Sequence, residues 1–275
     1  MVSAYKFFAV IFLTIVLLAV FAANHAFSDC STDAALVSEI YPRADQLPEN
    51  LLRFYIYFSE PMARENILSS ITLRDAEGEL IPGVFLDNRY DLWSPDSTRL
   101  TLLFDPGRVK TGLVAHNRLG RALISGQRYT LGIDSALDMK GCELTKAYTK
   151  TFEVREAYST KLDLDQWQLT QPKAETREPL SINLGREMDH LSLAYRIRIE
   201  NSDGNPVPGA LDLADNERVW VFTPSVPWQK MDYRISVDTE MEDVSGNRLS
   251  GVFDRPPTDG ELVIPSEKQY ILFRP

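Results

Sequence analysis

The acidic residues Glu60 and Asp96 are one example of a dispersed pair that could act in catalysis. Glu60 lies in the run FYIYFSEPM, residues 54–62, and Asp96 lies in the later segment SPDS. Two carboxyl groups about 5–10 Å apart can hydrolyse a glycosidic bond. The alternative is structural: Pro61 stops a strand and Met62 fills the end of a hydrophobic core. We favour the structural interpretation, and a hydrolase with a dispersed carboxylate pair is the weaker hypothesis.

Other patterns for catalysis or metal binding do not occur in the sequence. It has no G-x-S-x-G motif, and His116 and His190 stand far apart, where we expect surface positions. Asp87, Asp91 and Asp96 cluster in LDNRYDLWSPDS, but they do not match an EF-hand loop, and aspartate is common in turns. We therefore predict no enzyme, no metal site and no cofactor.

Two tryptophans could stack on sugar rings. Trp93 lies just before SPDS, and Trp228 lies in the turn-rich segment VPWQK, where we expect it to be exposed. Tryptophan combines a large apolar face with a polar N–H group. Trp220 alternates with Val219 and Val221 and is equally well explained as a core residue. A glycan-binding module that uses Trp93 or Trp228 is therefore an alternative function.

The segment 106–128 carries positive charge on an otherwise acidic chain. Its cations are Arg108, Lys110, Arg118, Arg121 and Arg128, and it contains no acidic residue between Pro106 and Arg128. Inserted loops on rigid scaffolds often carry function. One interpretation is a site for an anionic ligand, such as a carboxylate-bearing glycan or lipid headgroup, or for an acidic protein surface. The other is a solvated loop whose cations pair with nearby acids.

The overall charge argues against nucleic acid as a partner. The formal net charge is -10, and an acidic surface repels phosphate. The hydrophobic fraction of 44% and the charged fraction of 25% are typical of a globular protein.

The N-terminus has the pattern of a secretory signal peptide over residues 1–28. Lys6 precedes an apolar run at 7–23, and Ala26 and Ser28 suit cleavage before Asp29. The alternative is an uncleaved anchor formed by 7–23, and only then would we expect the protein to contact a membrane. We therefore expect a periplasmic, cell-surface or secreted protein.

The two cysteines, Cys30 and Cys142, predict a disulfide. They are the only cysteines, and an exported protein meets an oxidising compartment. Two free thiols are the alternative, and lipidation of Cys30 is a minor one because Phe27, Ser28 and Asp29 fit a lipobox poorly.

The strands and turns that we expect to position these residues occur as two copies of one sequence pattern. Phe54, Ile56 and Phe58 alternate with polar or tyrosine residues, as do Leu180, Ile182 and Leu184, which predicts two equivalent strands. Later segments repeat in the same order. The matched pairs are DAEG at 75–78 with NSDG at 201–204, RYTLGI at 128–133 with DYRISV at 232–237, and DMKGCEL at 138–144 with DVSGNRL at 243–249.

The repeat predicts an all-β protein of two tandem immunoglobulin-like β-sandwiches, at 29–156 and 157–275. The order FSEPM, then GQRYTLGI, then D-x-x-G-C or D-x-x-G-N resembles the bacterial Ig-like domain of the SbsA (S-layer) type, in two copies of which the second is diverged. The resemblance implies a cell-envelope or secreted setting and no chemistry. We therefore expect a non-catalytic protein that acts in binding, adhesion or spacing.

Overall fold

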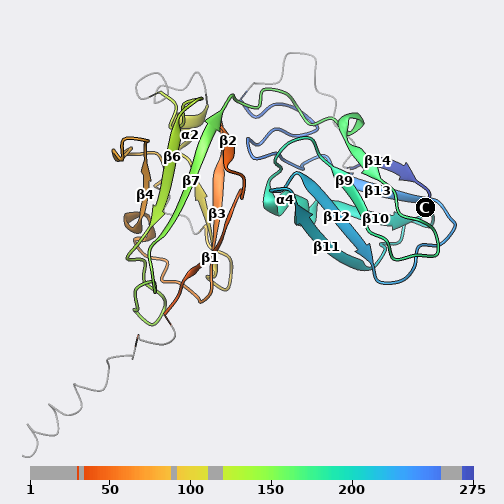
Figure 1. Cartoon of the computed structure of the whole chain (residues 1–275), viewed down its shortest axis with the longest axis horizontal. Coiled ribbons are helices and arrows are strands. Elements are labelled where there is room, and N and C mark those ends of the chain that lie inside the picture. The colour runs from red at the N-terminus through yellow and green to blue at the C-terminus, as the bar shows by residue number, and fades with distance from the viewer. Residues whose placement is uncertain (1–29, 31–33, 88–91, 111–119, 255–267) are drawn as a thin grey trace, which may run out of the picture.

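The structure is a computed structural model that describes residues 30, 34–87, 92–110, 120–254 and 268–275. The chain forms two lobes (Figure 1). Strands β1 to β7 build one lobe, which we call the first sandwich, and strands β8 to β14 build the other, the second sandwich. The predicted all-β fold of two tandem sandwiches is confirmed, whereas the predicted leader at 1–28 lies outside the described residues.

The first sandwich consists of two sheets. One sheet has the antiparallel order β1-β3-β5, and the other has the order β2-β7-β6-β4, in which β2 and β7 run parallel. The strands are β1 (Val37–Tyr41), β2 (Gln46–Pro48), β3 (Arg53–Phe58), β4 (Ile71–Arg74), β5 (Arg99–Leu103), β6 (Arg128–Ile133) and β7 (Tyr148–Arg155).

The second sandwich has the same two-sheet design. Its sheets have the orders β11-β12-β9-β8 and β10-β13-β14, and all their described pairs are antiparallel. The strands are β8 (Gln168–Thr170), β9 (Leu180–Asn183), β10 (Ile197–Asn201), β11 (Gly209–Ala214), β12 (Val219–Pro224), β13 (Tyr233–Asp238) and β14 (Lys268–Phe273).

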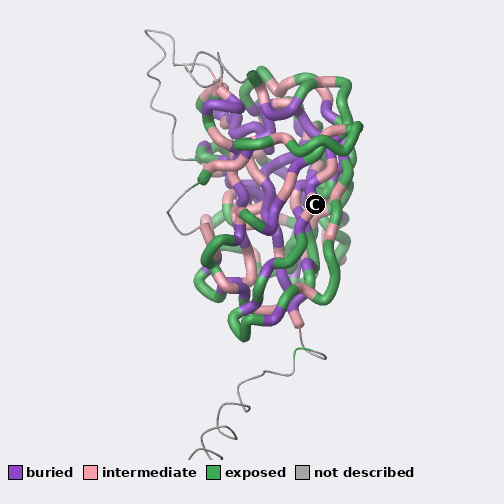
Figure 2. Tube along the Cα trace, turned by 90° about the vertical axis from the view of Figure 1, so that its left-hand side faces the viewer, coloured by how far each residue is buried: buried purple, intermediate pink, exposed green. Residues whose placement is uncertain are grey.

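Alternating apolar residues supply each core, as a strand with one buried face requires. Phe54, Ile56 and Phe58 of β3 are all at most 4% exposed. The ring of Phe54 lies 5.7 Å from that of Phe152 on β7, which joins the two sheets of the first sandwich. Figure 2 shows buried segments running through the interior, with exposed segments around them.

Irregular features of the backbone repeat between the two sandwiches. Met62 forms an isolated bridge with Asp138, and Met188 forms the equivalent bridge with Asp243. The bridges Arg74–Leu80 and Glu200–Pro206 correspond in the same way. The internal repeat seen in the sequence is therefore a repeat of backbone structure.

The helices are short and connect strands. They are η1 (Ile67–Ser70), α2 (Pro106–Val109), η2 (Leu164–Gln166) and α4 (His190–Tyr195). Helix α4 begins after Asp189, whose side chain accepts a hydrogen bond from the Ser192 backbone N–H at 2.9 Å. No helix in the described ranges has the length and apolar character needed to cross a membrane.

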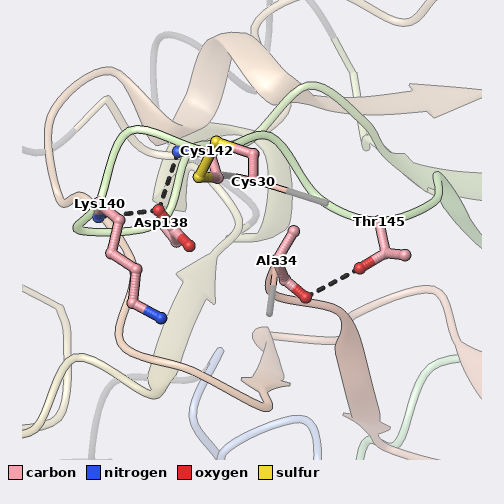
Figure 3. Close-up of a disulfide and its surroundings, with 6 residues drawn as sticks. All are labelled: Cys30, Ala34, Asp138, Lys140, Cys142 and Thr145. Carbon is pink, nitrogen blue, oxygen red and sulfur yellow. Dashed lines mark hydrogen bonds between the residues drawn. A yellow bond between two sulfur atoms is a disulfide. The ribbon is translucent and has the colours of Figure 1, made fainter. Parts of the chain in front are cut away.

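Cys30 and Cys142 form the predicted disulfide (Figure 3). It joins the start of the described chain to the turn that follows β6. Thr145 adds a hydrogen bond from its hydroxyl group to the Ala34 carbonyl oxygen at 2.8 Å. The N-terminal segment is therefore held to the first sandwich both covalently and by this hydrogen bond.

Candidate functional site

Trp228 belongs to the core of the second sandwich. Its side chain is 2% exposed, and its indole N–H donates to the Glu178 carbonyl oxygen at 2.8 Å. The ring meets Tyr233 and Phe273 edge-on, with centroids 5.1 and 5.7 Å away. The expectation that Trp228 is exposed is therefore wrong, because aromatic residues of β13 and β14 close over the ring.

Trp93 is half-buried. It packs against the core of the first sandwich with its ring centroid 5.7 Å from that of Phe58, and it forms an isolated bridge with Leu100. Trp220 is 2% exposed, in agreement with its interpretation as a core residue. A role for Trp93 in glycan binding stays a prediction.

Arg108 is a structural residue rather than a free cation. It is 8% exposed, and its guanidinium donates to the carbonyl oxygens of Gly120 at 3.0 Å and Pro82 at 3.2 Å. Backbone carbonyl groups thus satisfy a buried charge at this position. Arg108 therefore does not fit the interpretation of the whole segment as a solvated loop.

Two other cations of segment 106–128 contact protein groups. Arg121 forms ion pairs with Glu49 at 3.4 Å and Asp254 at 3.8 Å. The Lys110 ammonium lies 4.0 Å from the ring centroid of Phe253. Because Phe253 and Asp254 follow the second sandwich's late turn, this segment contacts both sandwiches.

Arg128 and Arg118 are the remaining cations of segment 106–128. Arg128 pairs with Glu153 at 2.8 Å on the exposed surface, and Arg118 lies outside the described residues. Of the four described cations, Arg121 and Arg128 pair with nearby acids, whereas Arg108 and Lys110 contact carbonyl groups and an aromatic ring. An anionic-ligand site on this segment stays a prediction.

The two candidate catalytic acids lie in different surroundings. Asp96 accepts hydrogen bonds from the Ser94 hydroxyl at 2.5 Å and the Thr98 backbone N–H at 3.2 Å, which together lower its pKa. Asp96 therefore fixes a turn, while Glu60 is half-buried at the end of β3. Among the described residues, no group of three or more His, Cys, Asp or Glu side chains could hold a metal ion.

The most extensive polar site lies where the two sandwiches meet, which we call the junction. One wall is the outer face of β3, whose residues Arg53, Tyr55 and Tyr57 alternate with the core residues of the same strand. The other wall is helix α4 and the turn after β13. Tyr55 is only 3% exposed, so protein covers the middle of this face, while Arg53 and Tyr57 on either side of it are half-buried.

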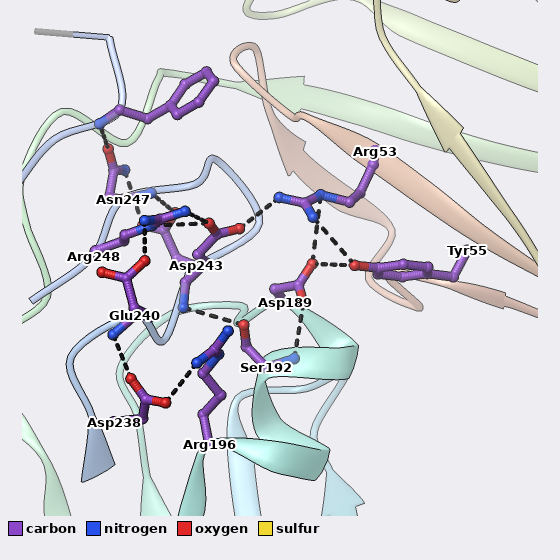
Figure 4. A network of polar contacts seen from close by, with 12 residues as sticks. Arg53, Tyr55, Asp189, Ser192, Arg196, Asp238, Glu240, Asp243, Asn247 and Arg248 are labelled. Carbon is purple, nitrogen blue, oxygen red and sulfur yellow. Dashed lines mark hydrogen bonds and ion pairs between the residues drawn. The ribbon is translucent and has the colours of Figure 1, made fainter. Parts of the chain in front are cut away.

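Asp189 connects the two walls (Figure 4). The Tyr55 hydroxyl donates to Asp189 Oδ2 at 2.8 Å, and Arg53 Nε lies 3.7 Å from the same oxygen. Arg53 Nη2 also pairs with Glu242 Oε2 at 2.5 Å. The residue that caps α4 therefore also anchors the helix to the first sandwich.

Burial and charge perturb the protonation equilibria of this cluster. Burial raises the pKa of Tyr55, and the nearby Asp189 carboxylate raises it further. Burial alone would lower the pKa of Arg53, but the carboxylates of Asp189 and Glu242 outweigh it, and the pKa is raised. Both shifts keep the protons in place, so Tyr55 is a neutral donor and Arg53 a permanent cation.

His190 packs between the sandwiches. Its ring stacks on Tyr41 with centroids 3.6 Å apart, and its Nε2 lies 3.1 Å from the Tyr57 hydroxyl oxygen. Burial, with the positive charges of Arg43 and Arg99, lowers the pKa of His190 to about 4. The expectation that His190 is a surface residue is wrong, and the ring is neutral at physiological pH.

Glu187 accepts hydrogen bonds from residues on both sides of the junction. It is fully buried and accepts bonds from Arg218 at 2.6 and 2.9 Å. Arg155, at the end of β7, and the Tyr158 hydroxyl also donate to it. Burial, followed by the Glu187 carboxylate, raises the pKa of Tyr158, so this phenol remains a donor.

Glu217 forms a second buried anchor. It is fully buried and accepts from the Arg43 backbone N–H at 2.8 Å and from Arg43 Nε at 3.0 Å. Burial raises the pKa of Glu217 despite these bonds. Because Arg43 follows β1 and Glu217 precedes β12, this contact ties the loops of the two sandwiches together.

Backbone groups also cross the junction. The Leu52 N–H donates to the Val244 carbonyl oxygen at 3.0 Å, and the Ser245 hydroxyl donates to Asn50 Oδ1 at 2.8 Å. Val244 itself packs into the core of the first sandwich. Gly246 has a φ of +76°, and a Cβ there would lie 2.4 Å from a methyl carbon of Leu52.

These contacts can fix the relative orientation of the sandwiches. Buried ion pairs contribute little net stability, because desolvation offsets attraction, but leaving one member unpaired costs about 3–5 kcal/mol. A changed angle between the sandwiches would leave several such groups unpaired at once. The junction therefore favours one orientation.

The sequence contained one signal for this site. Tyr55 and Tyr57 are large aromatic residues on a strand face that would otherwise meet water, and two in a row suggest a covered face. No sequence pattern indicated that Glu187, Asp189 and Glu217 are buried, because an isolated acidic residue is normally predicted to lie on the surface.

No family model matches the sequence, and no curated protein matches it. Native alpha-2-macroglobulin from Escherichia coli, over domains MG0-NIE-MG1, is 12% identical with a TM-score of 0.29, covering 74% of this chain and 66% of that one. The surface layer protein SbsC, domains 1–6, is 11% identical with a TM-score of 0.30, covering 75% and 39%. The chain spans less than two thirds of either structure.

A third similar structure is the Bacteroides ovatus protein SGBP-B in complex with a mixed-linkage heptasaccharide. It is 12% identical with a TM-score of 0.19, covering 81% of this chain and 43% of that one. At such identities and TM-scores these likenesses carry no inference about function. The assignment to the SbsA type stays a prediction.

Proposed function

We propose that this protein is an exported, non-catalytic spacer of the cell envelope that holds two sandwiches at a fixed angle. The observation that carries the proposal is the junction, where Glu187, Asp189 and Glu217 are buried and bonded to residues of the first sandwich. Two modules joined only by a flexible linker would not need these buried charges. A fixed angle suits a protein whose outer surfaces must be presented at a set distance.

The export part of the proposal rests on two observations. The disulfide between Cys30 and Cys142 fits an oxidising compartment, and the sequence at 1–28 fits a leader. Full-length protein from an exporting host should begin within a few residues of Asp29, which N-terminal mass spectrometry measures. An intact Met1 in the membrane fraction would support the anchored alternative instead.

Rigidity can be tested by measuring the distance between two spin labels. Glu77 and Asp203 are exposed, one on each sandwich, and can be replaced by cysteine for labelling while the native disulfide is kept. Pulsed electron resonance should give one narrow distance distribution. The variant Arg43→Ala/Arg53→Ala leaves Glu217 and Glu242 without these partners and should broaden it.

Arg128→Ala is the matched control, because it removes an arginine from an exposed pair within the first sandwich. It should leave the distribution narrow. A broad distribution in the unmodified junction would contradict the spacer proposal, whatever the variants do.

A further inference from the structure

A cleft opens at one side of the junction, beside the contacts that anchor α4. Its volume is about 420 Å³, and both sandwiches contribute to its walls. The first sandwich supplies Arg53 and Tyr55, and the second supplies α4 residues and the turn after β13. Clefts between domains are common ligand sites.

The charged groups around the cleft are already paired with one another (Figure 4). Arg53 pairs with Glu242, and Arg196 pairs with Asp238 at 2.5 Å. Arg248 bonds to Glu242 at 2.5 Å and also pairs with Glu240. A charged ligand would have to break one of these pairs, so the cleft does not favour strongly charged molecules.

The same network sets hydrogen-bond donors beside acceptors. The side chains of Arg196 and Glu240 line the cleft and remain 39% and 50% exposed. A guanidinium only donates and a carboxylate only accepts. A ligand that satisfies both at once needs groups that accept and donate, and a hydroxyl group does both.

The rim of the cleft carries an aromatic ring. Tyr195, the last residue of α4, is 65% exposed, and Leu191 lies one helical turn before it. An exposed tyrosine offers an apolar face with a polar tip. The apolar C–H face of a sugar ring can pack on such a surface while its hydroxyl groups reach the polar wall.

We propose that this cleft binds a neutral oligosaccharide, with Tyr195 as the stacking platform and Arg196 and Glu240 as hydrogen-bond partners. The site differs from the tryptophan sites that the sequence suggested, and it goes beyond the spacer role. An apolar ligand would leave the polar wall unsatisfied, and a charged one would compete with the existing pairs.

The proposal can be tested by calorimetric titration of the whole mature chain with cellohexaose, xylohexaose, mannohexaose and laminarihexaose. At least one should bind with a Kd below about 10 mM, and its affinity should not change with salt, because no net charge is neutralised. Tyr195→Ala should weaken binding about tenfold or more, and Tyr195→Phe should retain most of it. Glu240→Gln should weaken binding severalfold, because the amide alters the acceptor.

Tyr270→Ala is the matched control. Tyr270 is a 47% exposed tyrosine on β14 that does not line the cleft, so its removal should leave affinity unchanged. Two results would overturn the proposal: no oligosaccharide of the set binds, or Tyr195→Ala binds as tightly as the unmodified chain. Either result leaves the spin-label test of the spacer role unaffected.

Discussion

The two late turns of the chain, 138–142 and 243–247, share one backbone design and differ in what fastens them. In each, the Oδ1 atom of the leading aspartate accepts from the backbone N–H groups two and four residues later, at 2.8–2.9 Å. Asp138 is 2% exposed and Asp243 is fully buried. The inner halves of the two turns are therefore equivalent.

The outer oxygen of Asp243 is fully engaged. Its Oδ2 atom accepts from Arg186 Nη1 and Asn247 Nδ2, both at 3.0 Å. Asn247 also donates to the Tyr158 carbonyl oxygen at 3.0 Å, in the segment between the sandwiches. The second turn is thus part of the electrostatic network that reaches the junction.

The outer oxygen of Asp138 is buried and has no hydrogen-bond partner in the described part of the chain. Both donors have been replaced: Glu60 stands where the second copy has Arg186, and Cys142 stands where it has Asn247. Cys142 instead forms the disulfide with Cys30. The comparison teaches that one turn can be secured by a covalent bond or by ion pairing, according to what lies beside it.

The largest expected effect comes from removing the central acid of the second turn. Asp243→Ala leaves the Arg186 guanidinium and two backbone N–H groups without their acceptor and should lower the free energy of unfolding by about 3–5 kcal/mol. Asp138→Ala removes only the two hydrogen bonds that the side chain accepts from backbone N–H groups, and it should lower the free energy of unfolding by about 1–3 kcal/mol. Urea denaturation of both variants measures the difference, and equal losses would contradict the comparison.

Removal of the disulfide between Cys30 and Cys142 should have the next largest effect on the free energy of unfolding. The disulfide joins residues 112 positions apart, so Cys30→Ser/Cys142→Ser should cost about 2–4 kcal/mol. The free energy of unfolding, measured with and without reductant, checks this. Reductant should destabilise the unmodified chain and leave the double variant unchanged; an unmodified chain that is insensitive to reductant would refute the assignment.

Acid should act on the junction rather than on the first turn. The pKa of His190 is about 4 in the folded chain and near 6.5 when unfolded, so below pH 6.5 the unfolded state binds the proton first. Stability should therefore fall by about 1–3 kcal/mol as the pH drops from about 6.5 to about 4. The raised pKa of Glu217 acts in the opposite sense, since the folded state takes up that proton first.

The variant His190→Phe isolates the histidine contribution. Phenylalanine can stack on Tyr41 but cannot take up a proton, so the stability advantage of the unmodified chain over this variant should shrink with falling pH. A constant difference between the two denaturation series would show that His190 does not titrate as expected.

The turn glycines give the smallest and most direct comparison. Gly141 and Gly246 have φ angles of +82° and +76°, so alanine is strained at both by about 1–2 kcal/mol. Only at Gly246 would the added Cβ also meet Leu52, at 2.4 Å. Thermal melting should show that Gly246→Ala is the more destabilised variant; the reverse order would place the second turn away from the junction.

Local features of the fold could be read from the sequence. The alternation around Phe54, the D-x-x-G turns and the paired cysteines each depend on residues close in sequence or unique in type, and the structure agrees with them. Their physical basis is local: strand pleat, turn geometry and disulfide chemistry.

The contacts of the junction could not be predicted from the sequence. Arg43 and Glu217 lie 174 positions apart, and neither has neighbours that distinguish it from a surface charge. The burial of Trp228 and Arg108 could not be predicted for a related reason. It depends on strands and loops from distant parts of the chain, which the local sequence does not identify. Long-range pairing depends on the relative placement of the two sandwiches, which the repeat pattern leaves open.

The position of Val244 affects how the chain must fold during synthesis. Its side chain completes the core of the first sandwich, although it belongs to a turn of the second. An exported chain that crosses the membrane from its N-terminus presents every strand of the first sandwich before Val244. We therefore expect the first sandwich to lack one of its core side chains until most of the second copy has crossed, and a chaperone that covers apolar surface would find its binding site there.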